Sequence, residues 1–313
     1  MNTDKRTPLL LLSSLLALLA VGPLLPEWQF LATLALGKGL VVLGLLLLLR
    51  TGLVSFGQGL YYCLGGYAAG VMGHYWGVTD ATLLLLAAAL VSGVAAAVLG
   101  LLLARYRAIF FAMLSLALSM ILYGLLAKSQ TLGSTDGFNL APPTLLGFPL
   151  AGYEGRYALY SLACVLAFLA ALGLHYYFRT PLGRLATAIR DNEIRVEYLG
   201  ASVRGAVHVK YTIAGVLAGL GGALTGMTVG HIDPEMAYWT TSGEFVFIAI
   251  LSGTGSVAAP FLGSFIYELV RTFAYEYSPN TWQLALGAVM LLIIVFLPAG
   301  LWSLFRRRQG GAA

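Results

Sequence analysis

Charged side chains are scarce in this chain, whose 313 residues include 18 Lys and Arg and 13 Asp and Glu. Polar segments are also short, since the longest loops have about 25–30 residues, too few to bury a hydrophobic core of their own. A separate soluble domain is therefore excluded, and we expect residues 1–313 to form one transmembrane domain. The basic residues flank apolar runs, a distribution that marks membrane orientation and does not indicate a nucleic-acid partner.

Cysteines and nucleotide-binding motifs are equally sparse. Cys63 and Cys164 are the two cysteines, and both lie inside apolar runs, where they serve as small packing residues. A disulfide framework or a metal site would need more ligands at better spacing. The phosphate-binding pattern GxxxxGK[ST] is absent, so another chain must hydrolyse ATP if ATP drives this protein. We expect no catalytic, metal-binding or cofactor-binding residues here, and no enzyme activity.

Long apolar runs fill most of the sequence. Stretches of about 20 apolar residues recur along the chain, each long enough to cross a bilayer as an α-helix. Alternating strands of the barrel type are absent. The stretch at 242–270 is cut by SGTGSVAAP at 252–260, which predicts two short crossings or two half-helices. We therefore predict an all-α polytopic membrane protein with about ten transmembrane helices, the first of which, at about 8–25, is retained as an uncleaved helix.

The distribution of Lys and Arg predicts an orientation. If both termini are cytoplasmic, then only Lys128, Arg156 and Arg271 fall outside, and Lys38 falls within the membrane. Basic residues collect in cytoplasmic loops, so this orientation is favoured. The residues that it places in the cytoplasm are Lys5, Arg6, Arg50, Arg105, Arg107, Arg179, Arg184, Arg190, Arg195, Arg204, Lys210 and Arg306 to Arg308. The segment 179–207 is then cytoplasmic, and the loop 128–156 is external.

The most polar stretch, residues 180–201, lies in that cytoplasmic segment. Thr180 is a suitable N-cap, Pro181 suits the first helical position, and Gly200 suits the residue after the last turn. We predict one capped helix, in which Asp191 and Arg195 are spaced to pair at i,i+4. The helix is either a plain solvated connection or a surface on which a soluble partner pushes.

Other polar residues lie within the apolar runs. Residues 52–73 contain seven glycines, which permit close helix packing or a broken helix that lines a path. Ser115 and Ser119 share one helix face and serve either as interhelical hydrogen-bonding groups or as path-lining hydroxyls. The candidate path residues are Gln58, Tyr61, Tyr62, Ser115, Ser119, Ser252, Thr254 and Ser256.

Five motifs, in order and at matching spacing, resemble those of the high-affinity branched-chain amino-acid ABC permeases, specifically the LivM-type subunit. The similarity covers roughly residues 40–305, and the most specific motif reads GR-x-x-x-A-I-R-[DE]-N-E. In this chain the motifs are GLVSFGQGLYYCLGGYAAG at 52–70, RYRAIFFAMLSLALSM at 105–120, GSTDGFN at 133–139, PLGRLATAIRDNEIRVEYLGA at 181–201 and SGEFVFIAILSGTGSVAAPFLGS at 242–264. The chain departs from the family at Gln58, where many members have His, and at Tyr198, where Ala is usual.

The resemblance implies a bacterial inner-membrane importer that works by alternating access. Its partners would be a second, LivH-type permease, two ATPase subunits that carry ATP and Mg²⁺, an external substrate-binding protein and membrane lipid. Contacts with the binding protein would come from Asp136, Gly137, Asn139, Asp233 and Glu235. The ATPase-coupling residues would be Arg184, Arg190, Asp191, Asn192, Glu193, Arg195, Glu197 and Gly200.

The resemblance leaves the solute open among branched-chain amino acids, urea or short amides, and small aromatic acids. An ion-coupled secondary transporter is the alternative from another class, and it would need acidic residues within the membrane. Glu244 and Glu268 are the candidates, and the sequence places both near helix ends. An intramembrane enzyme is disfavoured because the four histidines all fall near helix ends.

Overall fold

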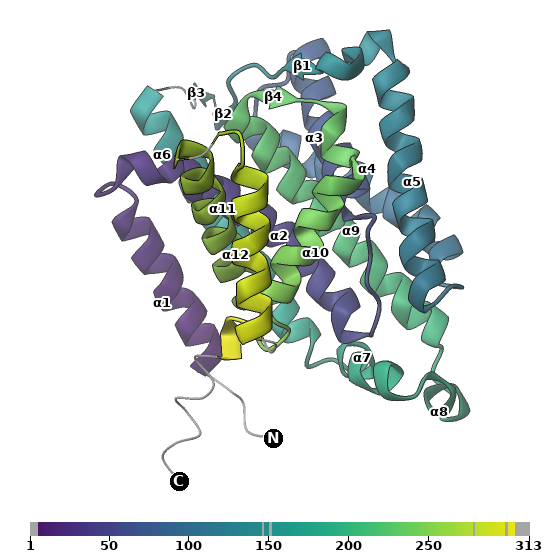
Figure 1. Ribbon diagram of the computed structural model, residues 1–313. Coiled ribbons are helices and arrows are strands. Elements are labelled where there is room, and N and C mark those ends of the chain that lie inside the picture. Colours follow the sequence, from purple (N-terminus) through teal and green to yellow (C-terminus); the bar gives the residue numbers. More distant parts are fainter. Residues whose placement is uncertain (1–5, 146, 150–151, 278, 298–299, 304–313) are drawn as a thin grey trace.

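The chain is almost entirely helical in the computed structural model, which describes residues 6–145, 147–149, 152–277, 279–297 and 300–303 (Figure 1). Both predicted cytoplasmic termini, residues 1–5 and 304–313, lie outside the described residues. The α-helices are α1 (Arg6–Val21), α2 (Gln29–Arg50), α3 (Gln58–Tyr75), α4 (Ala81–Leu103), α5 (Ala108–Lys128), α6 (Gly152–Tyr177), α7 (Pro181–Asp191), α8 (Glu193–Tyr198), α9 (Val203–Val229), α10 (Trp239–Ser252), α11 (Ala259–Tyr277) and α12 (Trp282–Phe296).

Four short strands and four 3-10 helices complete the described elements. Strand β1 (Phe138–Asn139) pairs antiparallel with β4 (His231–Ile232), and β2 (Thr144–Leu145) pairs with β3 (Phe148–Pro149). The 3-10 helices are η1 (Pro26–Trp28), η2 (Gln130–Leu132), η3 (Ser134–Asp136) and η4 (Pro234–Ala237).

Within the described residues, five helices are long and apolar enough to cross a membrane: Pro26–Arg50, Ala81–Leu103, Ala108–Lys128, Glu154–Tyr177 and Val203–Val229. This confirms the prediction of an all-α, multi-pass membrane protein. The count of ten crossings stays a prediction, since several of the other helices are shorter.

Helices α2 and α9 form the centre of the bundle, and α3, α4 and α11 pack around them. Helix α2 is predominantly apolar and buried over most of its length, as expected for a helix that other helices surround. Helix α1 lies at the outer edge, where it packs against α6 (Figure 1).

Glycine brings α3 and α9 into backbone contact. A Cβ atom on Gly65 would collide with the backbone of Gly219, and one on Gly222 would collide with the carbonyl oxygen of Tyr62. Small residues let helices approach closely in a membrane, where packing drives helix association. Helix α9 also packs closely against α4, because Gly215 and Gly219 meet Ala96 and Ser92.

The two ends of the bundle differ. Helices α7 and α8 lie outside the bundle at one end, which we call the α7 end, and the β1–β4 pair lies at the opposite end (Figure 1). The first turn of α1 and the last turn of α12 also lie at the α7 end (Figure 1).

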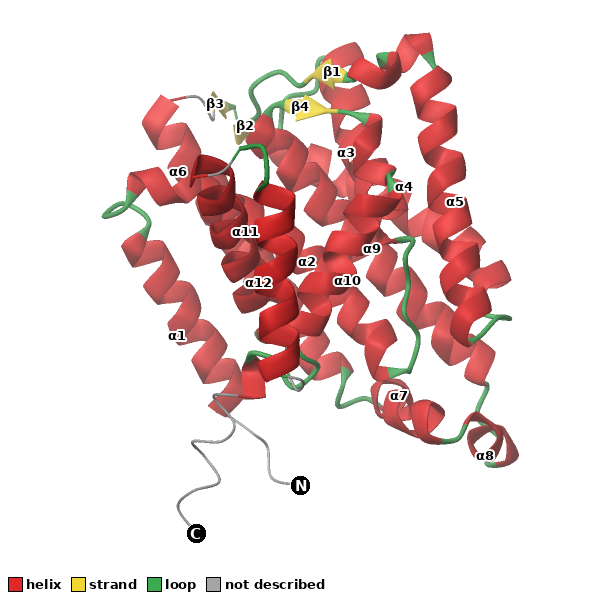
Figure 2. Ribbon diagram, viewed as in Figure 1, coloured by secondary structure: helices red, strands yellow, loops and turns green. Residues whose placement is uncertain are grey.

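Residues 51–57 are not helical, so α3 is shorter than the predicted run at 52–73. Gly52 adopts a positive φ of 81° directly after α2, and the chain then runs from the α7 end into the bundle as an irregular segment (Figure 2). The Phe56 amide donates to Ser115 Oγ at 3.1 Å, and the Gly59 amide donates to Ser242 Oγ at 3.0 Å. Side chains of α5 and α10 therefore satisfy amides that a regular helix would have bonded internally.

The second interruption lies where the sequence predicts one. Helix α10 ends at Ser252 and α11 begins at Ala259, with the connecting loop at the α7 end (Figure 1). Arg50 donates from Nε and Nη2 to the carbonyl of Thr254, at 3.1 and 2.8 Å. Its guanidinium also lies 4.0 Å from the ring centre of Phe178. One arginine at the end of α2 thus fixes the α10–α11 loop.

Candidate functional site

The predicted single helix at 180–201 is wrong, because the chain forms two helices that meet at Asn192. Asn192 has extended backbone angles, φ −161° and ψ 98°, and its Oδ1 accepts a hydrogen bond of 2.9 Å from the Arg195 amide. It therefore ends α7 and caps α8. The predicted N-cap is confirmed, since Thr180 Oγ1 accepts from the Gly183 amide at 3.1 Å.

Glu193 fixes this helix pair to the bundle. Its carboxylate accepts hydrogen bonds from Nε of Arg107, at 3.0 Å to Oε1 and 2.8 Å to Oε2. Arg107 lies in the turn between α4 and α5, so the pair joins α8 to a different part of the α7 end. The side chain of Arg190 packs against Gly52, where a Cβ atom would lie 3.3 Å from its Cγ. Helix α7 thus contacts the start of the irregular segment 51–57.

Three large apolar side chains are exposed on and directly after α8. Ile194, Tyr198 and Leu199 are 66%, 88% and 82% exposed, whereas Val196 is buried on the inner face. Helix α8 lies outside the bundle at the α7 end (Figure 1), and no other part of the described chain covers these three side chains. Sequence reasoning missed Ile194 and Leu199, although the i,i+4 spacing of Ile194 and Tyr198 was a usable signal. The predicted coupling residues exposed around them are Arg184, Arg190, Asp191, Asn192, Arg195, Glu197 and Gly200.

A second feature is a cavity of about 500 Å³ bounded by α2, α3, α9, η4, α10, α11 and α12. It is unusual in a membrane bundle because charged residues line it. They are Lys38, Asp233, Glu235, Glu244, Glu268 and Arg271.

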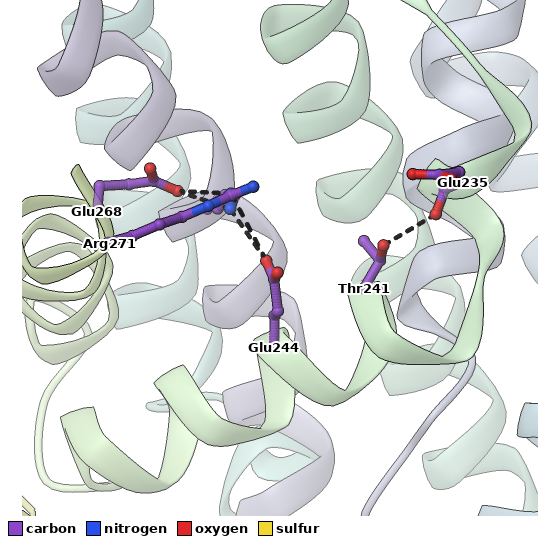
Figure 3. A network of polar contacts seen from close by, with 6 residues as sticks. Glu235, Thr241, Glu244, Glu268 and Arg271 are labelled. Atoms are coloured by element: carbon purple, nitrogen blue, oxygen red, sulfur yellow. Dashed lines mark hydrogen bonds and ion pairs between the residues drawn. The ribbon is translucent and has the colours of Figure 1, made fainter. Parts of the chain in front are cut away.

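Four of these charges form one network (Figure 3). Nζ of Lys38 lies 3.1 Å from Glu244 Oε2 and 2.6 Å from Glu268 Oε1. Nη1 of Arg271 lies 4.0 and 3.9 Å from the same two oxygens. The sequence placed Glu268 near a helix end, but it lies in the middle of α11. Two acids and two bases cancel in charge, which permits their burial.

Removing the central cation of this network should destabilise the fold strongly. Lys38→Met leaves Glu244 and Glu268 without their nearest cation, and unmatched buried charges cost about 3–5 kcal/mol. We expect a clear fall in the thermal unfolding temperature of the detergent-solubilised protein. The triple variant Lys38→Met, Glu244→Gln, Glu268→Gln should recover most of the loss. Equal stability of wild type and Lys38→Met would show that the network carries no stability.

The five predicted binding-protein contacts come together at the end opposite α7. Strand β1 pairs Asn139 with His231 of β4, and Asn139 Oδ1 lies 2.8 Å from His231 Nδ1. Gly137 has a φ of 65°, and a Cβ atom there would collide with the backbone of Ile232. Only glycine fits such a position. The loop after α5 and the loop after α9 therefore form one surface, which includes Asp136, Gly137, Asn139, Asp233 and Glu235.

The predicted path residues are dispersed. Tyr62 lines the charged cavity, whereas Gln58 and Tyr61 are fully buried, and Tyr61 donates from its hydroxyl to the hydroxyl of Tyr211 at 2.9 Å. Ser115 accepts from the Phe56 amide. These contacts show that part of the predicted path set holds helices together.

The remaining members of that set also make structural contacts. Ser119 donates from Oγ to the carbonyl of Ala237 at 2.7 Å, and Ser252 donates to Ile248 of its own helix at 2.6 Å. Thr254 and Ser256 lie in the α10–α11 loop, where the Thr254 carbonyl accepts from Arg50.

The α7–α8 pair and the charged cavity both lie in a region that matches a known protein family. The profile of the family described as the permease component of the branched-chain amino acid transport system matches residues 29–295. The chain belongs to this permease family. The match covers every helix from α2 to α11 and most of α12, and so includes both the α7–α8 pair and the charged cavity.

Named relatives of this permease include components of high-affinity branched-chain amino acid transport systems. The permease protein LivM of Escherichia coli K12 is 31% identical over 308 residues, covering 89% of this chain and 70% of LivM. BraD of Pseudomonas aeruginosa is 25% identical over 265 residues, covering 80% of this chain and 86% of BraD. LivH of Escherichia coli K12 is 23% identical over 139 residues, 44% of this chain and 45% of LivH. No solved structure matches this permease.

Proposed function

We propose that this permease is the LivM-type subunit of an ABC importer that moves branched-chain amino acids into a bacterial cell. In this proposal the α7 end faces the cytoplasm, both termini are cytoplasmic, and ten helices cross the inner membrane. The many arginines at the α7 end support the orientation, because basic residues collect on the cytoplasmic side.

The exposed apolar surface of α8 carries the proposal. Ile194, Tyr198 and Leu199 project from a helix outside the bundle and are surrounded by charged side chains. An apolar centre with a polar rim is the usual composition of a protein–protein interface. We infer that an ATPase subunit grips this surface, so that the predicted coupling residues of α7 and α8 surround the contact.

The position of α7 supports a mechanical role. Arg190 packs against Gly52, and the segment that follows ends at Gln58, the first residue of α3. Closure of two ATPases around ATP and Mg²⁺ would therefore press on a helix pair that touches the irregular backbone between α2 and α3. Alternating access follows if that pressure favours one of two bundle arrangements.

The other partners are proposed from the family and from the surface at the opposite end. A LivH-type permease would complete the translocation path, with Gln58, Tyr61, Tyr62 and the predicted serines and threonine as candidates for its walls. An external binding protein would dock over the joined β1 and β4 loops. Ion coupling is less well supported, because Glu244 and Glu268 are each matched by Lys38 and Arg271.

Co-purification tests the docking surface. We expect the tagged chain, extracted in detergent from its own cells, to recover a second permease and two ATPase subunits. The variant Ile194→Ser, Tyr198→Ser, Leu199→Ser should lose the ATPases and keep the second permease. A few hot-spot residues at the centre of an interface, often tyrosines, each contribute about 2 kcal/mol or more, so removing all three side chains should lose most of the ATPase.

A matched control uses another exposed tyrosine. Tyr277 is 81% exposed at the end of α11, away from α8, so Tyr277→Ser should keep all partners. A chain recovered alone that still takes up solute in a proton or sodium gradient would overturn the proposed function.

A further inference from the structure

The charged cavity has the composition of a binding site for a zwitterion. Besides its six charged residues, it is lined by Leu34, Tyr62, Val229, Met236, Tyr275 and Trp282. We infer that this cavity binds the amino acid directly on the permease, with the carboxylate at Arg271 and the ammonium group at Asp233 and Glu235. The inference rests on the proposed function and adds to it the residues that bind the solute.

Lys38 holds the network together and has little capacity left for a ligand. Its side chain is 7% exposed, and both nearby glutamates lie within ion-pair distance. It therefore fixes the positions of Glu244 and Glu268 on two different helices.

Arg271 is the cation that remains available. Its side chain is 39% exposed, and its distances of 3.9 and 4.0 Å to carboxylate oxygens exceed those of a normal hydrogen bond. The guanidinium lies 5.6 Å from the ring centre of Trp282, which supports it from one side. A planar guanidinium with unused N–H donors is suited to bind a carboxylate through two hydrogen bonds.

Two acids at the rim are suited to bind an ammonium group. Asp233 and Glu235 make no ion pair within the described part of the chain. Glu235 is exposed, so its carboxylate is open to a ligand that donates hydrogen bonds. Thr241 donates to the backbone carbonyl of Glu235 and holds that rim residue in place, apart from the cluster around Glu244 (Figure 3).

The charges also argue against an uncharged solute. Four acids and two bases line the cavity, and they include two acids without an ion pair in the described chain and a cation that is only weakly paired. Urea and short amides would leave these charges unmatched in a partly dehydrated site, at an energetic cost. An amino acid matches both signs at once, and the apolar walls accommodate its side chain.

Cysteine protection in membrane vesicles that contain the whole transporter tests this site. Thr272 lines the cavity and is exposed, so Thr272→Cys is a reporter for a charged methanethiosulfonate reagent. The native Cys63 and Cys164 are buried and should react slowly. We expect leucine to slow modification of the reporter, and 4-methylpentanoate, 3-methylbutylamine and urea to protect much less.

The variant Arg271→Gln in the same background should raise the leucine concentration for half protection on the order of 10- to 100-fold, the value of a charge-assisted hydrogen bond. Thr135→Cys, on an exposed residue of η3 that does not line the cavity, is the control that leucine should not protect. Absence of leucine protection, equal protection by urea, or unchanged protection in Arg271→Gln would overturn the inference. ATP-driven leucine uptake by the wild-type transporter is measured in parallel. If the wild-type transporter takes up no leucine, the proposed function is contradicted instead.

Discussion

Charge reversal at Glu193 should abolish most ATP-driven uptake, and simultaneous reversal at Arg107 should restore part of it. The single N–H at Nε of Arg107 donates a bifurcated hydrogen bond to both carboxylate oxygens of Glu193, and a charged hydrogen bond contributes about 1.5–3 kcal/mol. Glu193→Arg removes this bond and places two like charges together. Helix α8 would then lose its fixed position, and we expect uptake to fall at least about tenfold.

The double variant Arg107→Glu, Glu193→Arg re-forms the pair with the charges exchanged. The measurement is ATP-driven leucine uptake in vesicles with ATP hydrolysis followed in parallel, because uncoupling should lower uptake more than hydrolysis. Glu27→Arg reverses the charge of an exposed residue in η1, away from this pair, and serves as the control that should leave uptake unchanged. Normal uptake in Glu193→Arg would show that the pair has no role in coupling.

Gly65→Val should prevent formation of a stable bundle. The Cβ of valine would enter the backbone of Gly219, and a backbone collision between two central helices has no rotamer that relieves it. We expect a loss of at least about 3 kcal/mol, the upper end of overpacking costs, which is a large part of the stability of a typical protein. The measurements are the thermal unfolding temperature and the monodisperse fraction after extraction in detergent.

Gly173→Val is the matched control for this substitution. Gly173 lies in α6, where an added Cβ atom would meet open space out to 4 Å, so valine is accommodated there without a collision. Similar stability of the two variants would mean that α3 and α9 can separate without loss of the fold.

The sequence predicted the positions of the long helices well, because each apolar run is a local signal that spans one helix. It also predicted the break near 252–260 and the cap at Thr180, which depend on a few adjacent residues. It failed at Asn192, because an asparagine within a helical pattern is compatible with both a continuous helix and a cap.

The charge network could not be predicted because its partners are far apart in the chain. Lys38 and Glu244 are 206 residues apart, so their pairing depends on how α2, α10 and α11 pack. In the sequence, Lys38 is a single charge in an apolar run, and only the fold shows that it matches two acids. The same holds for Glu193 and Arg107, which are 86 residues apart, so no local pattern pairs them.

The irregular segment 51–57 constrains the order of assembly during synthesis. Its Phe56 amide needs Ser115, 59 residues later, and the Gly59 amide needs Ser242, which emerges 183 residues later. Bare backbone amides are not stable in lipid. The start of α3 therefore has to remain beside water or the insertion machinery until α5 and then α10 have been made. A nascent chain that stops before α10 would leave this segment incompletely covered, and membrane quality control would have a local defect to recognise.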